Sequence, residues 1–442
     1  MKAAALKYPV LSTVAILISL ILVVLPFHAF LTVWLASNFG HYTAFRLWKE
    51  ALLLGCSFGV VYLLLTDLRI RSHTLSRRLV WLILAYCGLV LGSGLLALHN
   101  HRVTPKALGY GLISDTRFLV FFLFCWMVAL RTARLHKNWQ RLLLWPAVIV
   151  IAFGLLQMLL LPNDFLRHFG YGSQTIAPVE TINHNAFYLR IQATLRGSNP
   201  LGAYLVVPLS VLTVLIVRGQ RCWQRLVLLL AGLLALGFTF SRSAWLGAAI
   251  AISLAAILGA RSAKTRRRLV YCGLAGVVAL AGLGLAIRHN TRYQNLVFHT
   301  ETHTTARQSS NQGHASALSA GLRDVAHQPL GRGTGTAGPA SVYNNHQTRL
   351  AENYFLQIGQ EVGLLGLLLF VLINGGVGYL LWSHRADPLA LSLFASLVGL
   401  TVINLLSHAW ADDTLAYIWW GFAGIAMAPR AVLADRVKPA EQ

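Results

Sequence analysis

The chain has 442 residues, of which 56% are hydrophobic and only 12% are charged, and soluble domains of this length have no core large enough for so much apolar surface. This composition argues against a soluble protein and indicates that most of the chain is solvated by a lipid bilayer. The net charge of +23 would suggest nucleic-acid binding in a soluble protein, but here it must first be divided between the two sides of the membrane.

Apolar runs recur along the chain and predict an all-α polytopic membrane protein of about twelve transmembrane helices. The first run follows Lys2 and Lys7 as in a signal peptide, but it continues to Leu35 without a small-residue cleavage site, so we expect a retained helix. The expected helices cover residues 10–33, 47–65, 79–98, 112–130, 142–161, 200–217, 225–240, 243–259, 269–287, 353–382, 389–408 and 414–429.

Short basic segments separate these helices at every second connection. If the N-terminus is cytoplasmic, these inner segments hold 22 of the 37 Lys and Arg residues, as the positive-inside rule requires. Both termini are therefore predicted to be cytoplasmic. The inner segments are residues 69–78, 131–141, 218–225, 261–268, 384–387 and the tail from 430, together with the N-terminal lysines.

This topology leaves two long outer segments, residues 163–199 and 288–352. It divides the chain into helices 1 to 9 (1–287), a large extracytoplasmic loop between helices 9 and 10 (288–352), and helices 10 to 12 with a cytoplasmic tail (353–442). The large loop has six arginines, six histidines and six glycines against three acidic residues. Topology alone does not explain that positive charge.

The outer end of the sixth helix carries Arg190 and Arg196, followed by Asn199-Pro200. An Asn-Pro pair is a typical turn and helix start, because proline fixes its backbone angle and has no amide hydrogen to satisfy in the first turn. Arg196 is thereby expected beside the exposed amides of a helix N-terminus, where phosphate is favoured. The alternative is an interfacial arginine whose side chain snorkels to the lipid surface.

Arg242 lies between two apolar runs that leave almost no room for a loop. An ionisable residue at the outer membrane surface normally faces the protein interior and has a partner, so we predict a functional role for Arg242. The alternative is a charge that only ends a helix.

Residues 329–339 of the large loop are rich in glycine and include Arg332. Such spacing lets backbone amides approach an anion, but no strand precedes it, so we expect a tight turn that packs the loop over the membrane domain. His299 and His303 have a spacing that suits zinc, yet no glutamate follows in the HExxH arrangement, and we predict no metal site. All five cysteines lie in or near expected helices, which argues against disulfides.

At these motifs the sequence resembles the O-antigen ligase family, which includes O-antigen polymerases and related glycan ligases of bacterial envelopes. The resemblance covers chiefly residues 190–366. It rests on four segments in order, 196–204 (RGSNPLGAY), 241–247 (SRSAWLG), 331–335 (GRGTG) and 352–366 (ENYFLQIGQEVGLLG).

The resemblance implies a GT-C-like, metal-independent glycosyltransferase of the bacterial inner membrane, with no cofactor. Such an enzyme moves a glycan from an undecaprenyl-pyrophosphate donor to an acceptor hydroxyl on a glycan or glycolipid at the extracytoplasmic side, as in the biosynthesis of lipopolysaccharide or another envelope polysaccharide. An isoprenoid pyrophosphate is already a good leaving group, so the enzyme needs mainly arginines for its charge and a base for the attacking hydroxyl. Its partners would be the donor, the acceptor and the bilayer, and not nucleic acid.

Arg196 and Arg242 match the two arginines of the family motifs, and we assign them to the pyrophosphate. We add Arg190 and Arg332 as further ligands of the same group. Asn199 and Asn353 are expected to support the site.

The base departs from the family pattern, because ligases of the family typically have His-Asn where this chain has Glu352-Asn353. Glutamate accepts a proton too, but its ordinary pKa near 4 makes it a weaker base unless burial raises that pKa. His346 and His314 are therefore also candidates. Glutamate at this point looks more like the polymerase-type members than the lipid A-core ligases.

Two other classes of membrane protein fit parts of the sequence. A secondary transporter would fit twelve helices with both termini inside, but transporters usually place charges near the bilayer midplane in related halves, which this sequence does not show. A polybasic lipid-binding scaffold would leave the outer loop unexplained.

Overall fold

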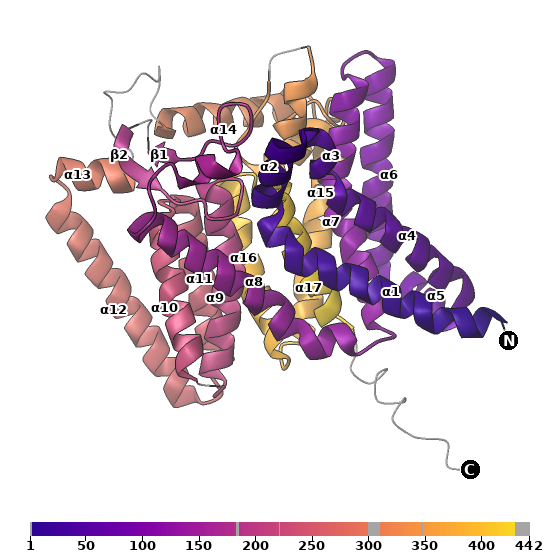
Figure 1. The fold of residues 1–442 in the computed structure, drawn as a ribbon, viewed down its shortest axis with the longest axis horizontal. Coiled ribbons are helices and arrows are strands. Elements are labelled where there is room, and N and C mark those ends of the chain that lie inside the picture. The colour runs from indigo at the N-terminus through magenta and orange to yellow at the C-terminus, as the bar shows by residue number, and fades with distance from the viewer. Residues whose placement is uncertain (1, 183–184, 221, 299–309, 346–347, 429–442) are drawn as a thin grey trace.

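The computed structural model describes residues 2–182, 185–220, 222–298, 310–345 and 348–428, and the chain folds as a bundle of long helices (Figure 1). Its first part contains α1 (Lys2–Val24), η1 (Leu25–Phe27), α2 (His28–Phe39), α3 (Tyr42–Arg46), α4 (Trp48–Thr66), α5 (Leu68–Leu75), α6 (Arg78–His99), α7 (Pro105–Ala129), α8 (Arg134–Leu159) and η2 (Phe165–Phe169).

The second part begins with a short antiparallel pair, β1 (Glu180–Ile182) and β2 (Asn185–Arg190), in which Glu180 is opposite Arg190. The helices that follow are α9 (Ser198–Val217), α10 (Trp223–Phe238), α11 (Arg242–Gly259), α12 (Ala263–Ile287), α13 (Thr291–Tyr293), η3 (Gln294–Phe298), α14 (Ser310–His327), η4 (Gly338–Tyr343), α15 (Tyr354–Ser383), α16 (Pro388–Leu406), η5 (Ala409–Ala411) and α17 (Asp413–Ala426).

The all-α polytopic membrane fold predicted from the sequence is confirmed, because the structure is 79% helical with almost no sheet. Each of the twelve expected spans contains a helix, and ten helical stretches in the described part of the chain are long and apolar enough to cross a bilayer. The two shorter helices are α10, with 16 residues, and α17, with 14. Because α17 packs against α7 and is buried along its length, it is a core element of the bundle.

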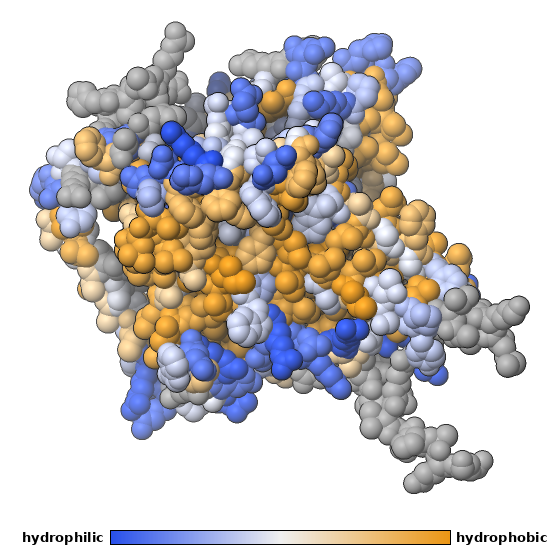
Figure 2. All heavy atoms as spheres, in the orientation of Figure 1, coloured by the Kyte–Doolittle hydropathy of each residue, from blue (hydrophilic) through white to orange (hydrophobic). Residues whose placement is uncertain are grey.

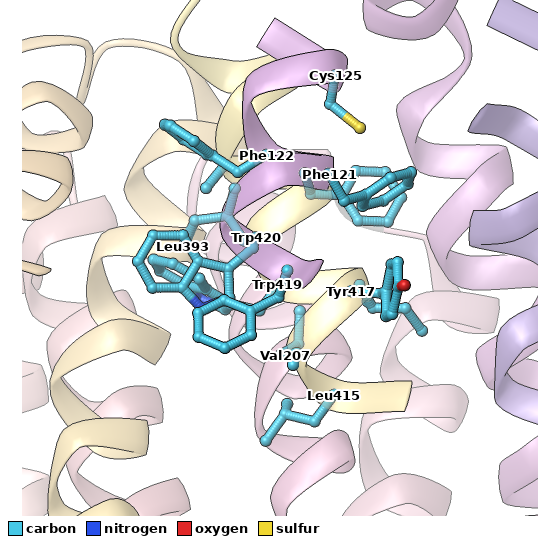
Figure 3. Packing of buried hydrophobic residues seen from close by; sticks show 14 of the residues in the cluster. Phe121, Phe122, Cys125, Val207, Leu393, Leu415, Tyr417, Trp419 and Trp420 are labelled. Atoms are coloured by element: carbon cyan, nitrogen blue, oxygen red, sulfur yellow. The ribbon is translucent and has the colours of Figure 1, made fainter. Parts of the chain in front are cut away.

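Large aromatic side chains fill the centre of the bundle between α7 and α17 (Figure 3). Trp419 and Trp420 of α17 are fully buried, and the Trp420 ring meets the edge of Phe122 of α7 with ring centres 5.7 Å apart. Burial of this much aromatic surface, with edge-to-face packing, holds α17 inside the ring of longer helices.

On the visible face of the molecule, a hydrophobic band lies between two hydrophilic margins, as expected for a protein set in a bilayer (Figure 2). We call one margin the loop face; it is formed by the described residues within 160–199 and 288–353 and carries β1, β2 and α14 (Figure 1). We call the opposite margin the basic face; it includes the short connections that contain Asp67, Arg131, His136, Arg218 and Asp387.

Contacts on the basic face join the segments that the sequence placed on one side. Arg131 Nε lies 2.7 Å from Asp67 Oδ2, and His136 Nε2 lies 3.2 Å from Asp387 Oδ2. Arg218 also donates to the carbonyl oxygens of Ala386, at 2.5 Å, and of Arg385, at 2.6 Å. These short connections therefore share one face, as the charge pattern predicts.

The glycine-rich segment is the tight turn expected from the sequence, and it docks on α6, α7 and α15. Gly333 has φ +106°, and a Cβ atom there would lie 2.2 Å from Ala97 Cβ, so only glycine fits. Thr334 Oγ1 donates to the carbonyl oxygen of Val90 at 2.7 Å. The turn thus fastens the large loop to the membrane domain.

Candidate active site

Arg196 projects from a loop that is fixed to two other helices. The amides of Gln192 and Ala193 both donate to Gln157 Oε1 of α8, at 3.2 and 2.9 Å, and Thr194 Oγ1 donates to the carbonyl oxygen of Pro26 at 2.8 Å. Ala193 has φ +48°, a conformation that non-glycine residues rarely adopt. The neighbours of Arg196 are buried while Arg196 itself is exposed at the loop face, so a rigid loop presents a free-standing cation there.

The helix N-terminus beside Arg196 is already capped by a carboxylate. Glu180 of β1 accepts a hydrogen bond from the Ser198 amide, with N and Oε2 3.0 Å apart, and another from the Ser198 hydroxyl. A Cβ atom at Gly197 would lie 2.5 Å from Glu180 Oε1, so this glycine makes room for the cap. The expectation that free amides at the start of α9 would hold phosphate is therefore wrong, because Glu180 occupies that position.

Arg190 connects the two arginine motifs. Its Nε donates to the carbonyl oxygen of Thr239, 2.8 Å away, and its second guanidinium nitrogen donates to Asn199 Oδ1, 2.7 Å away. Burial lowers the pKa of Arg190, an effect that Glu180 opposes and Arg242 increases. Arg190 and Asn199 thus hold the ends of α9 and α10 together, with two of the arginine's donors already committed to the protein.

Arg242 is the first residue of α11, directly after a sharp turn from α10. The turn requires φ +47° at Phe240, and Trp245 Nε1 closes it by donating to the carbonyl oxygen of Leu236 at 2.9 Å. This geometry confirms that almost no loop separates the two helices and that Arg242 is partly buried at the helix mouth. Its positive charge lowers the pKa of both Arg190 and His314.

His314 of α14 and Glu352 come together above these arginines. The ring nitrogen Nδ1 of His314 contacts Oε2 of Glu352. Glu352 has φ +51°, a strained conformation for a non-glycine residue that typically marks a functional position. Partial burial lowers the pKa of His314, and the positive charge of Arg242 lowers it further. Both effects favour the neutral imidazole, in which one ring nitrogen donates and the other accepts a proton.

Residues 226–371, from α10 into α15, match the family model described as O-antigen ligase. Over this segment the chain is similar to O-antigen ligases. The matched segment contains Arg242, His314 and Glu352, whereas Arg196 lies before it. A comparison with curated proteins finds no match to the chain.

Four residues form what we call the Arg–His–Glu cluster of this O-antigen ligase-like chain: Arg196, Arg242, His314 and Glu352. Electrostatic effects connect its members. Arg242 lowers the pKa of His314, and both Arg196 and His314 lower the pKa of His408. Its residues come from the start of α9, the start of α11, α14 and the approach to α15. The long loop thus brings His314 within the field of Arg242, and His408 lies within the fields of both His314 and Arg196.

Sequence reasoning missed His408, which lies between α16 and α17. Burial, with the positive charge of Arg196 as the next cause, lowers the pKa of His408 to about 4, and Asp412 opposes this shift. The sequence placed His408 at the last position of an apolar span. The signal that would have found it is the polar pair Asp412-Asp413 a few residues later, which interrupts two apolar runs.

Two further expected site residues have structural partners. Arg332 donates to Asp324 Oδ1 at 3.1 Å, and Gln360 Nε2 donates to the second oxygen of the same carboxylate at 2.9 Å. Asn353 caps α15, because its Oδ1 accepts from the Leu356 amide at 3.0 Å. Both residues hold the large loop and α15 in place rather than presenting free donors.

Some expected residues lie outside the described part of the chain: His346, His299 and His303. Among the residues that the structure does describe, no group of three His, Cys, Asp or Glu side chains is arranged to hold a metal ion.

Glu361 anchors the glycine turn from inside the bundle. Its Oε1 accepts from the amides of Gly335 and Ala337, at 3.0 and 3.1 Å. Asp115 of α7 lies close to Glu361, and both side chains are fully buried.

Proposed function

We propose that this O-antigen ligase-like membrane enzyme transfers a glycan from undecaprenyl pyrophosphate to an acceptor hydroxyl, with the Arg–His–Glu cluster as its active site. The observation that carries the proposal is the contact of His314 with Glu352 within the field of Arg242, together with His408, whose pKa both Arg196 and His314 lower. Phosphate-binding cations and a neutral base beside a carboxylate are the groups that this transfer needs.

In the proposed reaction the acceptor oxygen bonds to the anomeric carbon of the donor sugar while the bond from that carbon to the phosphate oxygen breaks. The acceptor proton passes to His314 Nε2, and Glu352 orients the ring and stabilises the imidazolium that forms. The pyrophosphate leaves with one additional negative charge, which Arg196 and Arg242 stabilise. Arg190 positions the two helix mouths, as its hydrogen bonds to Thr239 and Asn199 indicate.

We place the loop face on the extracytoplasmic side of the bacterial inner membrane, with both termini in the cytoplasm. The support is the charge pattern, because the short connections of the basic face are dense in Arg and Lys. The donor lipid would then reach the cluster from the outer leaflet.

Two acceptor classes remain for this site, a glycolipid core in a ligase or a second lipid-linked glycan in a polymerase. Glu352 in place of the family's histidine favours the polymerase type. Neither acceptor changes the assignment of the arginines.

The proposal is tested with the purified full-length chain in nanodiscs, an undecaprenyl-pyrophosphate oligosaccharide, and either acceptor in separate reactions. Released undecaprenyl pyrophosphate and an extended acceptor are the expected products, in equal amounts. Transport of the intact donor across a proteoliposome membrane without any release of lipid pyrophosphate would overturn the proposal and favour a transporter.

A further inference from the structure

A cavity of about 300 Å³ lies beside Arg196, between α2, α3 and the start of α17. His314, Glu352 and Arg242 do not line it, so Arg196 is common to the cavity and to the Arg–His–Glu cluster. The polar lining includes Tyr42, Arg46, Thr175, Arg196, Asp412 and Asp413.

Buried ion pairs hold one wall of the cavity in place. Asp413 Oδ2 lies 3.0 Å from Lys49 Nζ, and Asp413 Oδ1 contacts the guanidinium of Arg117. Glu50 completes the group, with Oε2 3.1 Å from Lys49 and Oε1 3.1 Å from Arg117. Lys49 is only 1% exposed and Arg117 only 7% exposed. Two cations and two anions therefore balance, which fixes the direction of Asp413 without leaving a net charge.

Other lining groups are also held in defined orientations. Trp48 Nε1 donates to Nδ1 of His28, 2.9 Å away, and Arg46 donates to the hydroxyl oxygen of Tyr110, 2.6 Å away. Asp412 caps α17 by accepting from the Leu415 amide at 3.2 Å through Oδ1. The cavity is thus preorganised before any ligand enters.

The lining chemistry suits a sugar. The carboxylates of Asp412 and Asp413 share the wall with the guanidinium groups of Arg46 and Arg196, so charges of both signs line the cavity. Carboxylates, guanidinium groups and the hydroxyl groups of Thr32 and Tyr42 together offer donors and acceptors for a neutral polyhydroxylated ligand. The volume is near the lower end of the roughly 300–1,000 Å³ usual for small-molecule sites, which suits one sugar unit or two.

We propose that this cavity binds a sugar unit of the substrate next to the pyrophosphate arginine Arg196. The inference rests on the proposed function and adds a subsite to it. The sugar is either the donor unit attached to the pyrophosphate or the terminal unit of the acceptor, and binding experiments distinguish the two.

Ala29 also lines the cavity, and Ala29→Leu fills it without altering an arginine. Equilibrium binding is measured with three probes: undecaprenyl pyrophosphate, the undecaprenyl-pyrophosphate oligosaccharide, and the free acceptor oligosaccharide. Undecaprenyl pyrophosphate is expected to bind the variant as tightly as the unsubstituted chain. One sugar-bearing probe is expected to lose about tenfold or more in affinity, the size of loss that a mismatched pocket produces. The probe that weakens identifies the donor or the acceptor as the occupant.

Ala36→Leu is the matched control, because Ala36 is in the same helix but outside the cavity lining. Asp412→Asn is the second variant, since asparagine still caps a helix but no longer offers a carboxylate to the sugar. The same probe should bind Asp412→Asn with lower affinity than it binds the unsubstituted chain.

If both sugar-bearing probes bind the Ala29→Leu and Asp412→Asn chains as tightly as the unsubstituted chain, the subsite is overturned; it is also overturned if neither sugar-bearing probe binds the unsubstituted chain. Failure of undecaprenyl pyrophosphate alone to bind would contradict the proposed function instead and leave sugar binding as the deciding measurement for the cavity.

Discussion

The imidazole of His314 in α14 contacts the carboxylate of Glu352, the residue that precedes the cap of α15. His314 lies near the start of the described stretch 310–345, whereas Glu352 lies at the end of the loop, just before α15. Their contact joins α14 to the approach of α15, and it places the imidazole within the field of Arg242 at the start of α11.

The proposed base predicts the pH dependence of transfer. His314 accepts a proton only when it is neutral, and its pKa lies below the ordinary 6.5 because of burial and Arg242. Activity should therefore be fully present at pH 7 and fall only as the pH drops below 6.5 through that lowered pKa. A pH–rate profile of kcat/KM checks this, and an acidic limb centred above pH 6.5 would contradict it.

Removal of the base predicts a loss of rate. His314→Ala should lower kcat by about 100-fold or more, the usual contribution of a positioned base. His327→Ala is the matched control, since His327 is an exposed histidine of the same helix whose Nδ1 is hydrogen-bonded to the carbonyl oxygen of Arg323. Glu352→Gln should reduce kcat less than His314→Ala. The reverse order would assign the proton transfer to Glu352 itself.

The carboxylate cap of α9 predicts a stability effect. Glu180→Ala removes the acceptor of the Ser198 amide and should lower the free energy of unfolding by about 1 kcal/mol, as for other lost helix caps. Asp164→Ala serves as the control, because Asp164 is exposed and pairs only at 3.8 Å with the exposed Arg167. Thermal unfolding in detergent measures both, and an equal melting temperature for Glu180→Ala and the unsubstituted chain would contradict the cap.

Asp115 and Glu361, the two buried acids, are predicted to differ in how much stability is lost when each is substituted. Asp115→Asn should be tolerated, because an asparagine amide of the same shape can donate to the nearby carboxyl group of Glu361. Glu361→Ala leaves the amides of Gly335 and Ala337 without an acceptor and should cost about 1–3 kcal/mol for each unsatisfied group. Limited proteolysis at the glycine turn reports its release. Equal protection of both variants would show that Glu361 does not hold the turn.

Much of the fold was predictable because long apolar runs and short basic connections are local signals. The same is true of the sharp turn before Arg242, where two runs meet without a loop. The β1–β2 pair was not predicted, since three and six residues give too little alternation to recognise a strand.

The site was predictable only in part. Arg196, Arg242, His314 and Glu352 carried motif or charge signals, and the structure brings them together at the loop face. The cap by Glu180, the pairing of Arg332 with Asp324 and the proximity of His408 depend on contacts between distant segments, which sequence spacing does not encode. Lys49 and Arg117 are charged residues inside apolar runs, a pattern that indicates buried ion pairs. Their pairing with Glu50 and Asp413 was not predicted.

The central claim, that Arg196 and Arg242 bind the leaving pyrophosphate, is tested most directly by transfer kinetics of Arg196→Ala and Arg242→Ala beside Arg167→Ala, a control at an arginine of the same face that is 68% exposed. We predict that each active-site variant loses about 100-fold or more in kcat/KM, as when a donor to a developing charge is removed, while the control transfers normally and all three melt at similar temperatures. Transfer at the unsubstituted rate by both Arg196→Ala and Arg242→Ala would contradict the account.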